Sequence, residues 1–208
     1  DPRKSVDATI REPLVVSGRY KKNEIDDATR ELMEFVGIDE RLRMSYPHEL
    51  DGGRRQRVGI ARALALNPDF VVCDEPVSAL DVSIQAQVLN LLKKLQQQKG
   101  LTYMFVTHDM SVVRDISDEI CVMYLGQMVE KCPSKELFKH PLHPYTRALL
   151  SAIPLPNPHA ERRKKLLVYD PSMHDYAHHS PEFTEIEPGH FVLANSGELE
   201  NYQQMLNV

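Results

Sequence analysis

The stretch that decides the fold runs from Leu50 to Asp81 and reads LDGGRRQRVGIARALALNPDFVVCDEPVSALD. Near its centre, Phe70 to Cys73 is a short apolar run without alternation, which is typical of a parallel strand covered on both faces. Asp74 and Glu75 follow directly, at the carboxyl end of that strand. Open α/β sheets bind their ligands at this edge. The stretch therefore predicts a parallel α/β sheet with two carboxylates at its ligand-binding edge.

Two adjacent carboxylates at such an edge suit phosphate chemistry. The first can hold a hydrated Mg²⁺ ion, and the second can orient and deprotonate a water molecule that attacks a phosphate. A bare Asp-Glu pair also fits a simple acidic turn, but its neighbours favour the chemical interpretation. Ser78 to Asp81 forms a second turn that ends on an acid, and Thr107-His108-Asp109 follows another apolar run, Tyr103 to Val106. From a parallel neighbour strand, His108 could reach the same phosphate.

Four motifs in this order resemble those of ABC-type ATPases. LDGGRRQR resembles the signature loop of that family, FVVCDEP its Walker B strand, SALD its D-loop and THD its switch-histidine loop. The resemblance implies an α/β fold: a partial P-loop NTPase core with a helical subdomain and a C-terminal extension. It also implies ATP hydrolysis, with ATP and Mg²⁺ as the cofactors.

The resemblance assigns roles to the residues at the sheet edge. Asp74 would hold Mg²⁺ through water, Glu75 would act as general base or water orienter, and His108 would sense or stabilise the γ-phosphate. Ser78 and Asp81 would couple the two sites of an ATPase dimer. Most of the catalytic effect would come from positioned charge.

The signature departs from the commonest family form at Asp51, where serine is usual. Gly52 and Gly53 present amides at the start of a basic helix, expected from Arg54 to about Leu66, and amides in that position bind anions. With Arg54 they would contact ATP held by the other subunit. An ionised Asp51 would repel the γ-phosphate unless Mg²⁺, Arg54 or water intervenes, whereas the same carboxylate is a good helix cap. A capping role and a weakened composite site are compatible, and both stay open.

Composition limits the partners. The 208 residues carry a net charge of −5, which argues against a dedicated nucleic-acid binder, so the arginines after Gly53 are expected to pair with acids or phosphate. Of the three cysteines, Cys73 and Cys121 are expected to be reduced thiols buried in strands, and Cys132 lies at no metal-ligand spacing from them. No apolar run reaches the roughly 18 residues that cross a bilayer, and no signal peptide opens the chain. Membrane association would require a partner.

Nothing in the 208 residues matches the P-loop pattern GxxxxGK[ST]. By resemblance the chain begins just after the family's glutamine loop, which predicts the C-terminal portion of a longer ATPase. The expected regions are a helical subdomain with the lead-in to the signature in residues 1–50, the C-terminal half of the ATPase core in 51–132, and an extension in 133–208. Alone, this portion is expected not to bind ATP tightly or hydrolyse it, and its incomplete sheet is expected to favour self-association.

Periodicity and caps place the remaining elements. Asn23 is expected to cap a helix from Glu24 to Val36, and the first twenty residues receive no element. In the family this helical region receives the coupling helix of a membrane subunit, although a plain helical hairpin explains its periodicity equally well. Further along the chain we expect helices over Glu40–Met44, Asp81–Lys99, Met110–Ile116 and Tyr145–Ala152, and strands over Leu101–Thr107, Ile120–Leu125 and Met128–Glu130. Asp81 is expected to open its helix and Gly100 to stop it, Ser134 to cap a short helix through Lys139, and Gly126-Gln127 to join the last two strands in a hairpin.

Two later segments narrow the resemblance. HPYTRALLSAIPLPNP, residues 143–158, and EPGHFVL, residues 187–193, resemble ATPase subunits of oligopeptide and dipeptide importers. The resemblance implies a second ATPase subunit, identical or different, integral membrane permease subunits and, indirectly, a peptide-binding protein. It implies no nucleic-acid partner and a peripheral position at the cytoplasmic face of the cell membrane. Prolines after Ala152 predict an extended linker, followed by a charged run, a short strand-like segment and a polar tail.

Histidines and cysteines of the extension offer few metal sites. His140 and His143 could ligate a metal, but no cysteine or carboxylate accompanies them at ligand spacing, so a structural role is favoured. A cluster of three further histidines could bind adventitious zinc, although a solvated loop is favoured: His174, His178 and His179. Some importer ATPases bind an iron–sulfur cluster through cysteines here, but no cysteine follows Cys132, so no cluster is predicted.

Two other functions stay open. The first is a non-catalytic half-site or interaction module of an ABC dimer, favoured by Asp51 but opposed by the presence of Glu75 and His108. The second is a soluble ABC ATPase of DNA repair or translation, which would share the signature and Walker B motifs. The HPYTRALL segment and the acidic charge balance count against it.

Overall fold

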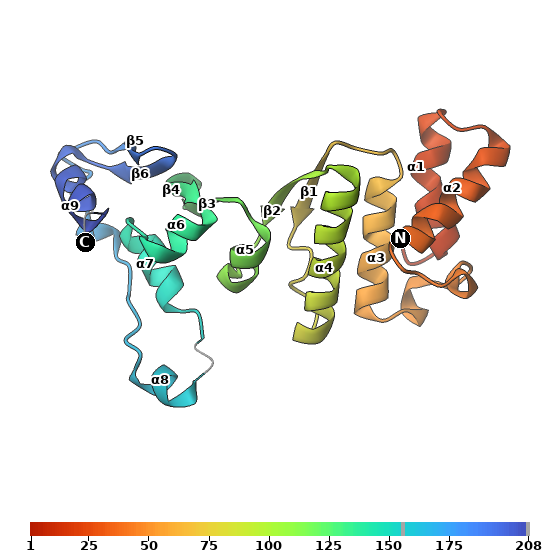
Figure 1. The fold of residues 1–208 in the computed structure, drawn as a ribbon, viewed down its shortest axis with the longest axis horizontal. Coiled ribbons are helices and arrows are strands. Elements are labelled where there is room, and N and C mark those ends of the chain that lie inside the picture. The colour runs from red at the N-terminus through yellow and green to blue at the C-terminus, as the bar shows by residue number, and fades with distance from the viewer. Residues whose placement is uncertain (155–156, 207–208) are drawn as a thin grey trace. The chain divides into compact units, whose positions relative to one another are not determined.

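The computed structural model describes residues 1–154 and 157–206. Figure 1 shows the elements, which form two compact units, residues 1–108 and 109–208, and each unit is described by itself. The three regions expected from the sequence, 1–50, 51–132 and 133–208, are divided by family motifs and not by contacts, so they stay a prediction. Leu155 and Pro156 of the expected linker lie outside the described residues. Among the described residues, no helix combines the length and apolar character needed to span a membrane.

The first unit combines helices with a two-stranded parallel sheet. Strand β1 pairs with β2 in parallel, with Phe70 opposite Thr102 and Asp74 opposite Val106, so both strands end at the same edge. This confirms the expected parallel neighbours. The elements in chain order are α1 (Val6–Ser17), α2 (Lys22–Phe35), the 3-10 turns η1 (Glu40–Leu42) and η2 (Pro47–Glu49), α3 (Gly52–Leu64), β1 (Phe70–Asp74), α4 (Val82–Lys99) and β2 (Thr102–Val106).

One face of this sheet is exposed, which corrects the expectation of strands covered on both faces. Cys73 on β1 is buried, whereas its neighbour Val72 is 56% exposed. The apolar side chains on the open face come from alternate positions of the paired strands, namely Phe70, Val72, Met104 and Val106. The apolar composition of a strand therefore did not reveal how many of its faces are covered in this chain.

The N-terminal helices begin earlier than the sequence predicted. Helix α1 received no prediction, although Ser5 caps it and Ile10 and Leu14 on one face are buried. Helix α2 starts at Lys22, so Asn23 lies inside its first turn and is not the cap. Glu24 instead accepts a hydrogen bond from the backbone N–H of Lys21. Gly37 ends this region with a left-handed φ of 69°, as expected for a helix stop.

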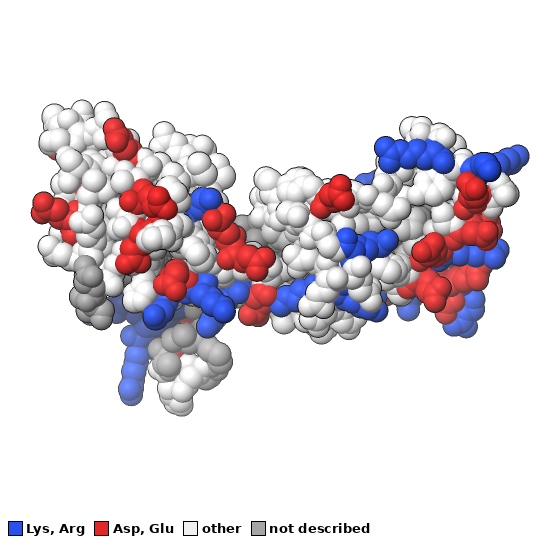
Figure 2. All heavy atoms as spheres, turned by 45° about the horizontal axis from the view of Figure 1, so that its top comes forward, with Lys and Arg blue, Asp and Glu red and all other residues white. Residues whose placement is uncertain are grey.

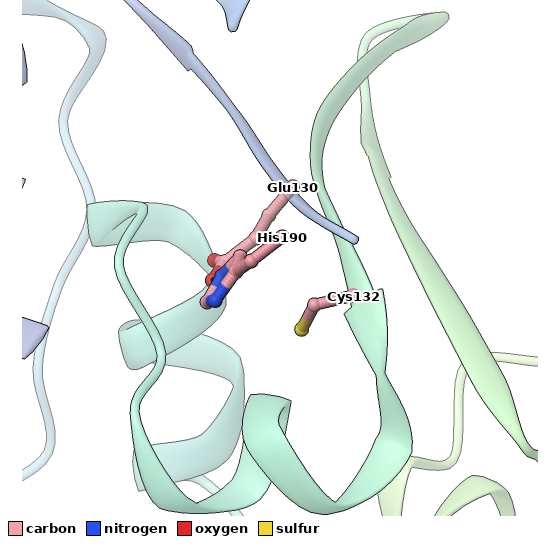
Figure 3. Close-up of side chains that lie close together, drawn as sticks. All are labelled: Glu130, Cys132 and His190. Carbon is pink, nitrogen blue, oxygen red and sulfur yellow. The ribbon is translucent and has the colours of Figure 1, made fainter. Parts of the chain in front are cut away.

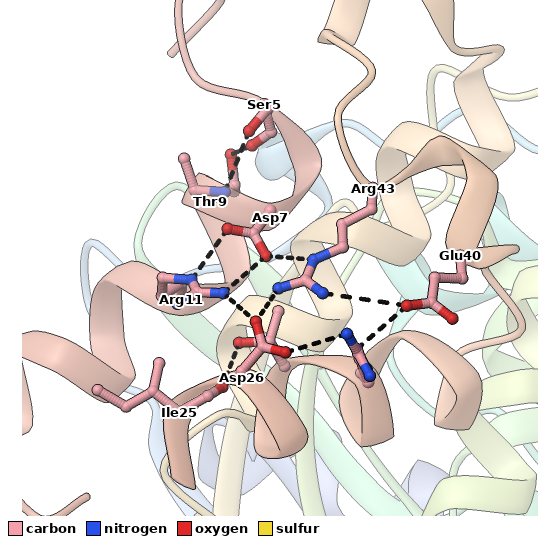
Figure 4. A network of polar contacts seen from close by, with 11 residues as sticks. Ser5, Asp7, Thr9, Arg11, Ile25, Asp26, Glu40 and Arg43 are labelled. Atoms are coloured by element: carbon pink, nitrogen blue, oxygen red, sulfur yellow. Dashed lines mark hydrogen bonds and ion pairs between the residues drawn. The ribbon is translucent and has the colours of Figure 1, made fainter. Parts of the chain in front are cut away.

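A network of ion pairs fastens the N-terminal helices to η1 (Figure 4). Arg43, whose side chain is only 15% exposed, donates to Asp7 on α1 at 2.6 Å and also to Asp26 on α2. Arg11 bridges the same two carboxylates at 2.9 and 2.7 Å. Hydrogen bonds from these arginines lower the pKa of Asp26 to about 2. Over these helices Figure 2 shows acidic and basic side chains intermingled, not gathered by sign.

The second unit is built on an antiparallel sheet of order β3-β4-β6-β5. The β3–β4 hairpin at Gly126 was expected, but β5, β6 and α9 replace the predicted polar tail. Leu166 to Val168 form no strand and are exposed, contrary to the strand-like segment predicted there. The elements are α5 (Met110–Ile116), β3 (Glu119–Tyr124), β4 (Gln127–Pro133), α6 (Ser134–Lys139), α7 (Pro144–Ser151), α8 (Pro158–Arg163), η3 (Pro171–Met173), β5 (Glu182–Glu187), β6 (His190–Ala194) and α9 (Ser196–Leu206).

Three local predictions for this unit were wrong. Cys121 faces outward on β3 and is exposed, because the alternation of the strand places Ile120 and Val122 in the core instead. Ser134 is the first residue of α6 and not its cap, and its hydroxyl donates to the backbone carbonyl of Arg114. His174 is not solvated, since its side chain is 2% exposed and its Nδ1 lies 2.5 Å from Glu198.

Candidate functional site

The paired carboxylates lie where β1 ends. Asp74 is the last residue of the strand, and both it and Glu75 are exposed. Glu75 adopts a left-handed φ of 44°, which is uncommon for a residue with a Cβ. Its backbone N–H donates to the carbonyl of Val106 at 2.8 Å, so the turn after β1 is attached to the end of β2. Exposed carboxylate oxygens of this kind suit the preference of Mg²⁺ for hard oxygen ligands.

The two predicted catalytic side chains are in direct contact. Nδ1 of His108 lies 2.9 Å from Oε1 of Glu75. The side chains are 72% and 49% exposed, so solvent and ligand can reach both. The hydrogen bond from His108 lowers the pKa of Glu75, which keeps this carboxylate ionised at neutral pH. An ionised carboxylate can accept a proton from water.

The turn from Ser78 to Asp81 is attached to the backbone of Glu75. Both the backbone N–H and the hydroxyl of Ser78 approach the carbonyl of Glu75, at 3.4 and 3.2 Å. Asp81 caps α4 as expected, because its Oδ1 accepts hydrogen bonds from the N–H of Ile84 at 3.0 Å and from the hydroxyl of Ser83 at 2.7 Å. The hydrogen bond from Ile84 N–H lowers the pKa of Asp81.

Asp51 caps helix α3. Its Oδ1 accepts a hydrogen bond from the backbone N–H of Arg54 at 2.7 Å, and the guanidinium of Arg54 lies 3.4 Å from its other oxygen. The helix begins at Gly52, so Gly52 and Gly53 belong to its first turn and do not precede it. Arg57 donates to the carbonyl of Val36 at the end of α2, a partner that the sequence did not predict.

The two glycines also lie against the turn that follows Glu75. A Cβ on Gly52 would lie 3.0 Å from Leu80, and a Cβ on Gly53 would lie 2.5 Å from Ile84. The start of α3 therefore packs closely on the start of α4. The sequence predicted close backbone approach at these glycines but not its partners, because no local pattern identifies which side chain faces a glycine.

The predicted site residues form two adjoining groups in the first unit. Asp74, Glu75 and His108 share the edge of the sheet, and the Ser78–Asp81 turn leads from that edge to α4. The residues from Asp51 to Arg54 begin α3, beside that turn.

Comparison with known proteins identifies two families, which match different parts of the chain. A family described as ABC transporter matches residues 1–78, and a family described as oligopeptide/dipeptide transporter, C-terminal region, matches residues 129–178. The chain is 54% identical over 206 residues to the oligopeptide transport ATP-binding protein AmiF of Streptococcus pneumoniae, covering 99% of this chain and 67% of AmiF. It belongs to the oligopeptide transport ATP-binding proteins of the ABC transporter family.

Other members of this family and solved structures agree. Oligopeptide transport ATP-binding protein OppF of Bacillus subtilis is 52% identical over 204 residues, and the chain spans 67% of its length. The ATP-binding cassette MJ0796, solved as a dimer bound to ADP and phosphate, aligns with a TM-score of 0.57 and 32% identity over 64% of this chain and 58% of its own. CbiO1 of Clostridium perfringens aligns with a TM-score of 0.59 and 29% identity over 65% of this chain and 53% of its own. An ABC-type α/β fold is therefore shown.

Proposed function

We propose that this chain belongs to an ATP-hydrolysing subunit that powers the import of oligopeptides or dipeptides. The observation that carries the proposal is the 2.9 Å contact between Glu75 and His108 at the carboxyl edge of β1 and β2, in a member of this family. The named relatives are ATP-binding proteins of oligopeptide transport, which supports both the nucleotide and the cargo.

Each residue of the edge has a proposed task. Asp74 would hold Mg²⁺ through water, and the ion would supply positive charge to the phosphates. Glu75 would take the proton of the attacking water or orient that water, and His108 would hold the carboxylate in place while facing the γ-phosphate. Ser78 and Asp81 would transmit a change at the edge to α4.

The residues at the start of α3 would complete the site of a second ATPase subunit. The amides of Gly52 and Gly53, with the guanidinium of Arg54, would meet ATP bound to that subunit. This second subunit, identical or different, and integral membrane permease subunits are the proposed partners, and a peptide-binding protein would deliver the cargo. We propose a peripheral position at the cytoplasmic face of the membrane, without an iron–sulfur cluster and without a nucleic-acid partner.

Replacement of the base tests this proposal. In a form of the protein that includes a P-loop, Glu75→Gln keeps the shape of the side chain but removes its basicity. Turnover should fall by roughly 10²-fold or more while ATP stays bound. The matched control is Glu34→Gln, which changes an exposed acid on α2 and should leave turnover unchanged. Unchanged turnover in Glu75→Gln would rule out Glu75 as the base.

A second measurement concerns the 208-residue chain itself. Calorimetry with ATP and Mg²⁺ should show no tight binding by this chain and micromolar binding by a form that includes a P-loop. Tight binding by the 208 residues alone would place the phosphate site elsewhere and overturn the assigned roles.

A non-catalytic half-site is the second candidate, and Asp51 favours it. The carboxylate of Asp51 stands where the family usually has serine, and its negative charge would oppose the γ-phosphate of the partner's ATP. Asp51→Ser keeps a capping oxygen and removes the charge. A rise in turnover of the dimer would identify this signature as a weakened one. If turnover does not rise, Asp51 caps the helix without slowing ATP hydrolysis.

A further inference from the structure

The second unit contains a buried group of three different metal-ligating side chains (Figure 3). Glu130 and Cys132 alternate along β4, and His190 lies on the paired strand β6, where Glu130 is opposite Val192. All three therefore project from the same face of the sheet. They are 0%, 0% and 3% exposed, and one ligand atom from each lies within 4.8 Å of the others.

Glu130 already links three parts of this unit. Its Oε1 accepts the N–H of Leu142 at 2.8 Å, and its Oε2 accepts the N–H of His143 at 3.0 Å. Nε2 of His190 lies 2.9 Å from Oε1. The carboxylate thus holds the segment before α7 against β4 and β6. Hydrogen bonds explain the position of Glu130 and His190, but they leave out the buried thiol of Cys132, for which no hydrogen bond is recorded in the described part of the chain.

The set of donors favours one class of ion. A thiolate selects borderline or soft cations over Mg²⁺ and Ca²⁺, and a combination of cysteine, histidine and carboxylate suits Zn²⁺. Zn²⁺ with one thiolate, one carboxylate and one neutral imidazole is electrically neutral, which is the least costly charge state for a buried site. Three protein ligands leave one tetrahedral position for a small ligand such as water.

We propose that Glu130, Cys132 and His190 form a buried Zn²⁺ site in the second unit. Sγ of Cys132, Nε2 of His190 and Oε1 of Glu130 bind the ion. The thiol proton of Cys132 is released to solvent. The imidazole of His190 binds through Nε2 in its neutral form, so the proton that lay between His190 and Glu130 moves to Nδ1 of the same ring. The bound ion joins β4 to β6 and, through Glu130, to the segment that begins α7. This inference does not depend on the proposed ATPase function.

Cobalt substitution tests the site on the 208-residue chain. After removal of metals, titration with Co²⁺ should show one tightly bound equivalent with a thiolate-to-cobalt charge-transfer band, and Zn²⁺ should abolish that band by displacement. Cys132→Ser should lose the band. Since the chain has three cysteines, Cys73→Ser with Cys121→Ser leaves Cys132 alone, and this double variant should keep the band. The double variant therefore identifies Cys132 as the thiolate ligand without altering any residue of the proposed site.

Several outcomes would overturn the proposal. One is the absence of a charge-transfer band in the unmodified chain. A second is a band that persists in Cys132→Ser or disappears in the double variant while circular dichroism shows native structure. A third is Co²⁺ bound only without thiolate, which would indicate adventitious binding by surface histidines such as His178 and His179.

Discussion

Gly53 and Ile84 are in such close contact that position 53 of α3 has no room for a side chain. A Cβ on Gly53 would lie 2.5 Å from Cγ2 of Ile84, a separation that real Cβ atoms do not show. Gly53 lies in the first turn of the basic helix, and Ile84 belongs to the first turn of α4, which Asp81 caps. The contact therefore fixes the distance between the proposed signature and the turn after Glu75.

Gly53→Ala should destabilise the first unit. The added methyl group must displace Ile84 or the backbone of α3, which costs about 1–3 kcal/mol for overpacking of this kind. The measurement is urea denaturation followed by circular dichroism. Gly59→Ala in the same helix is the matched control, because a Cβ there meets nothing within 4 Å. It should stabilise by up to about 1 kcal/mol through helix propensity. Equal effects of the two substitutions would disprove the close contact.

Asp51→Ala should weaken the start of α3. Loss of the cap that Asp51 provides to Arg54 N–H typically costs about 1 kcal/mol. Asp51→Ser retains a capping oxygen and should cost only a few tenths of this. The difference between the unfolding free energies of the two variants separates the contribution of the capping oxygen from that of the negative charge. If alanine and serine variants are equally stable, the cap makes no measurable contribution.

Arg43→Met should destabilise the N-terminal helices more than Arg41→Met. Arg43 is largely buried and bridges carboxylates on two helices, whereas Arg41 is 89% exposed and pairs with the nearby Asp39. Loss of Arg43 removes a largely buried bridge and leaves Arg11 as the arginine that still contacts both acids, at a cost of about 1–3 kcal/mol. Loss of Arg41 should cost less than about 0.5 kcal/mol. Thermal denaturation of both variants provides the comparison. Similar melting temperatures would show that the network adds no stability.

The second unit should lose stability as the pH falls below neutrality. Burial, with a smaller effect of the stacked His174, lowers the pKa of His143 to about 4 from the ordinary 6.5. The folded state binds this proton less readily than the unfolded state does. The contribution of His143 to the free energy of unfolding is therefore fully present above pH 6.5 and falls progressively towards pH 4. At pH 5 the loss is about 2 kcal/mol relative to pH 7.

His143→Asn isolates this effect. Asparagine can keep the acceptor that caps Tyr145 N–H but does not titrate, so the loss between pH 7 and pH 5 should shrink by about 2 kcal/mol. Tyrosine near-UV circular dichroism reports on the unit, since the ring of Tyr169 lies beside that of His143 and packs against the ring of Tyr145. His178 is exposed, so His178→Asn is the control and should leave the dependence of the unfolding free energy on pH unchanged. An unchanged slope in His143→Asn would assign the pH dependence to other groups.

Much of the first unit could be predicted from local signals. Asp81 as the cap of α4, Gly100 as its stop and the strands that precede Asp74 and Thr107 all follow from short-range physics, and the structure confirms them. Helix α1 was missed because Pro13 lies inside it and interrupted its pattern. The contact between Glu75 and His108 agrees with the expected convergence at the sheet edge, while the chemical roles of both residues stay predictions.

The second unit was harder to predict because its order depends on distant contacts. Strand β5 is mostly polar and β6 is short, and after a histidine-rich segment this pattern indicated a tail. Strand β6 pairs with β4, which lies about sixty residues earlier, and the buried Glu130 that joins β4 to His190 has no local signature. Cys121 shows the reverse error, since an apolar neighbourhood did not reveal which way a strand residue points.

The left-handed backbone of Glu75 has a consequence for how the proposed base and histidine move. Val106 holds the main chain of Glu75 by a hydrogen bond, and His108 follows Val106 by only two residues. Glu75 follows β1 but is thus also tied to the end of β2, the strand that precedes His108. If that strand slides or tilts during a catalytic cycle, acid and imidazole should travel together, and their separation should stay nearly constant while their distance to a nucleotide changes.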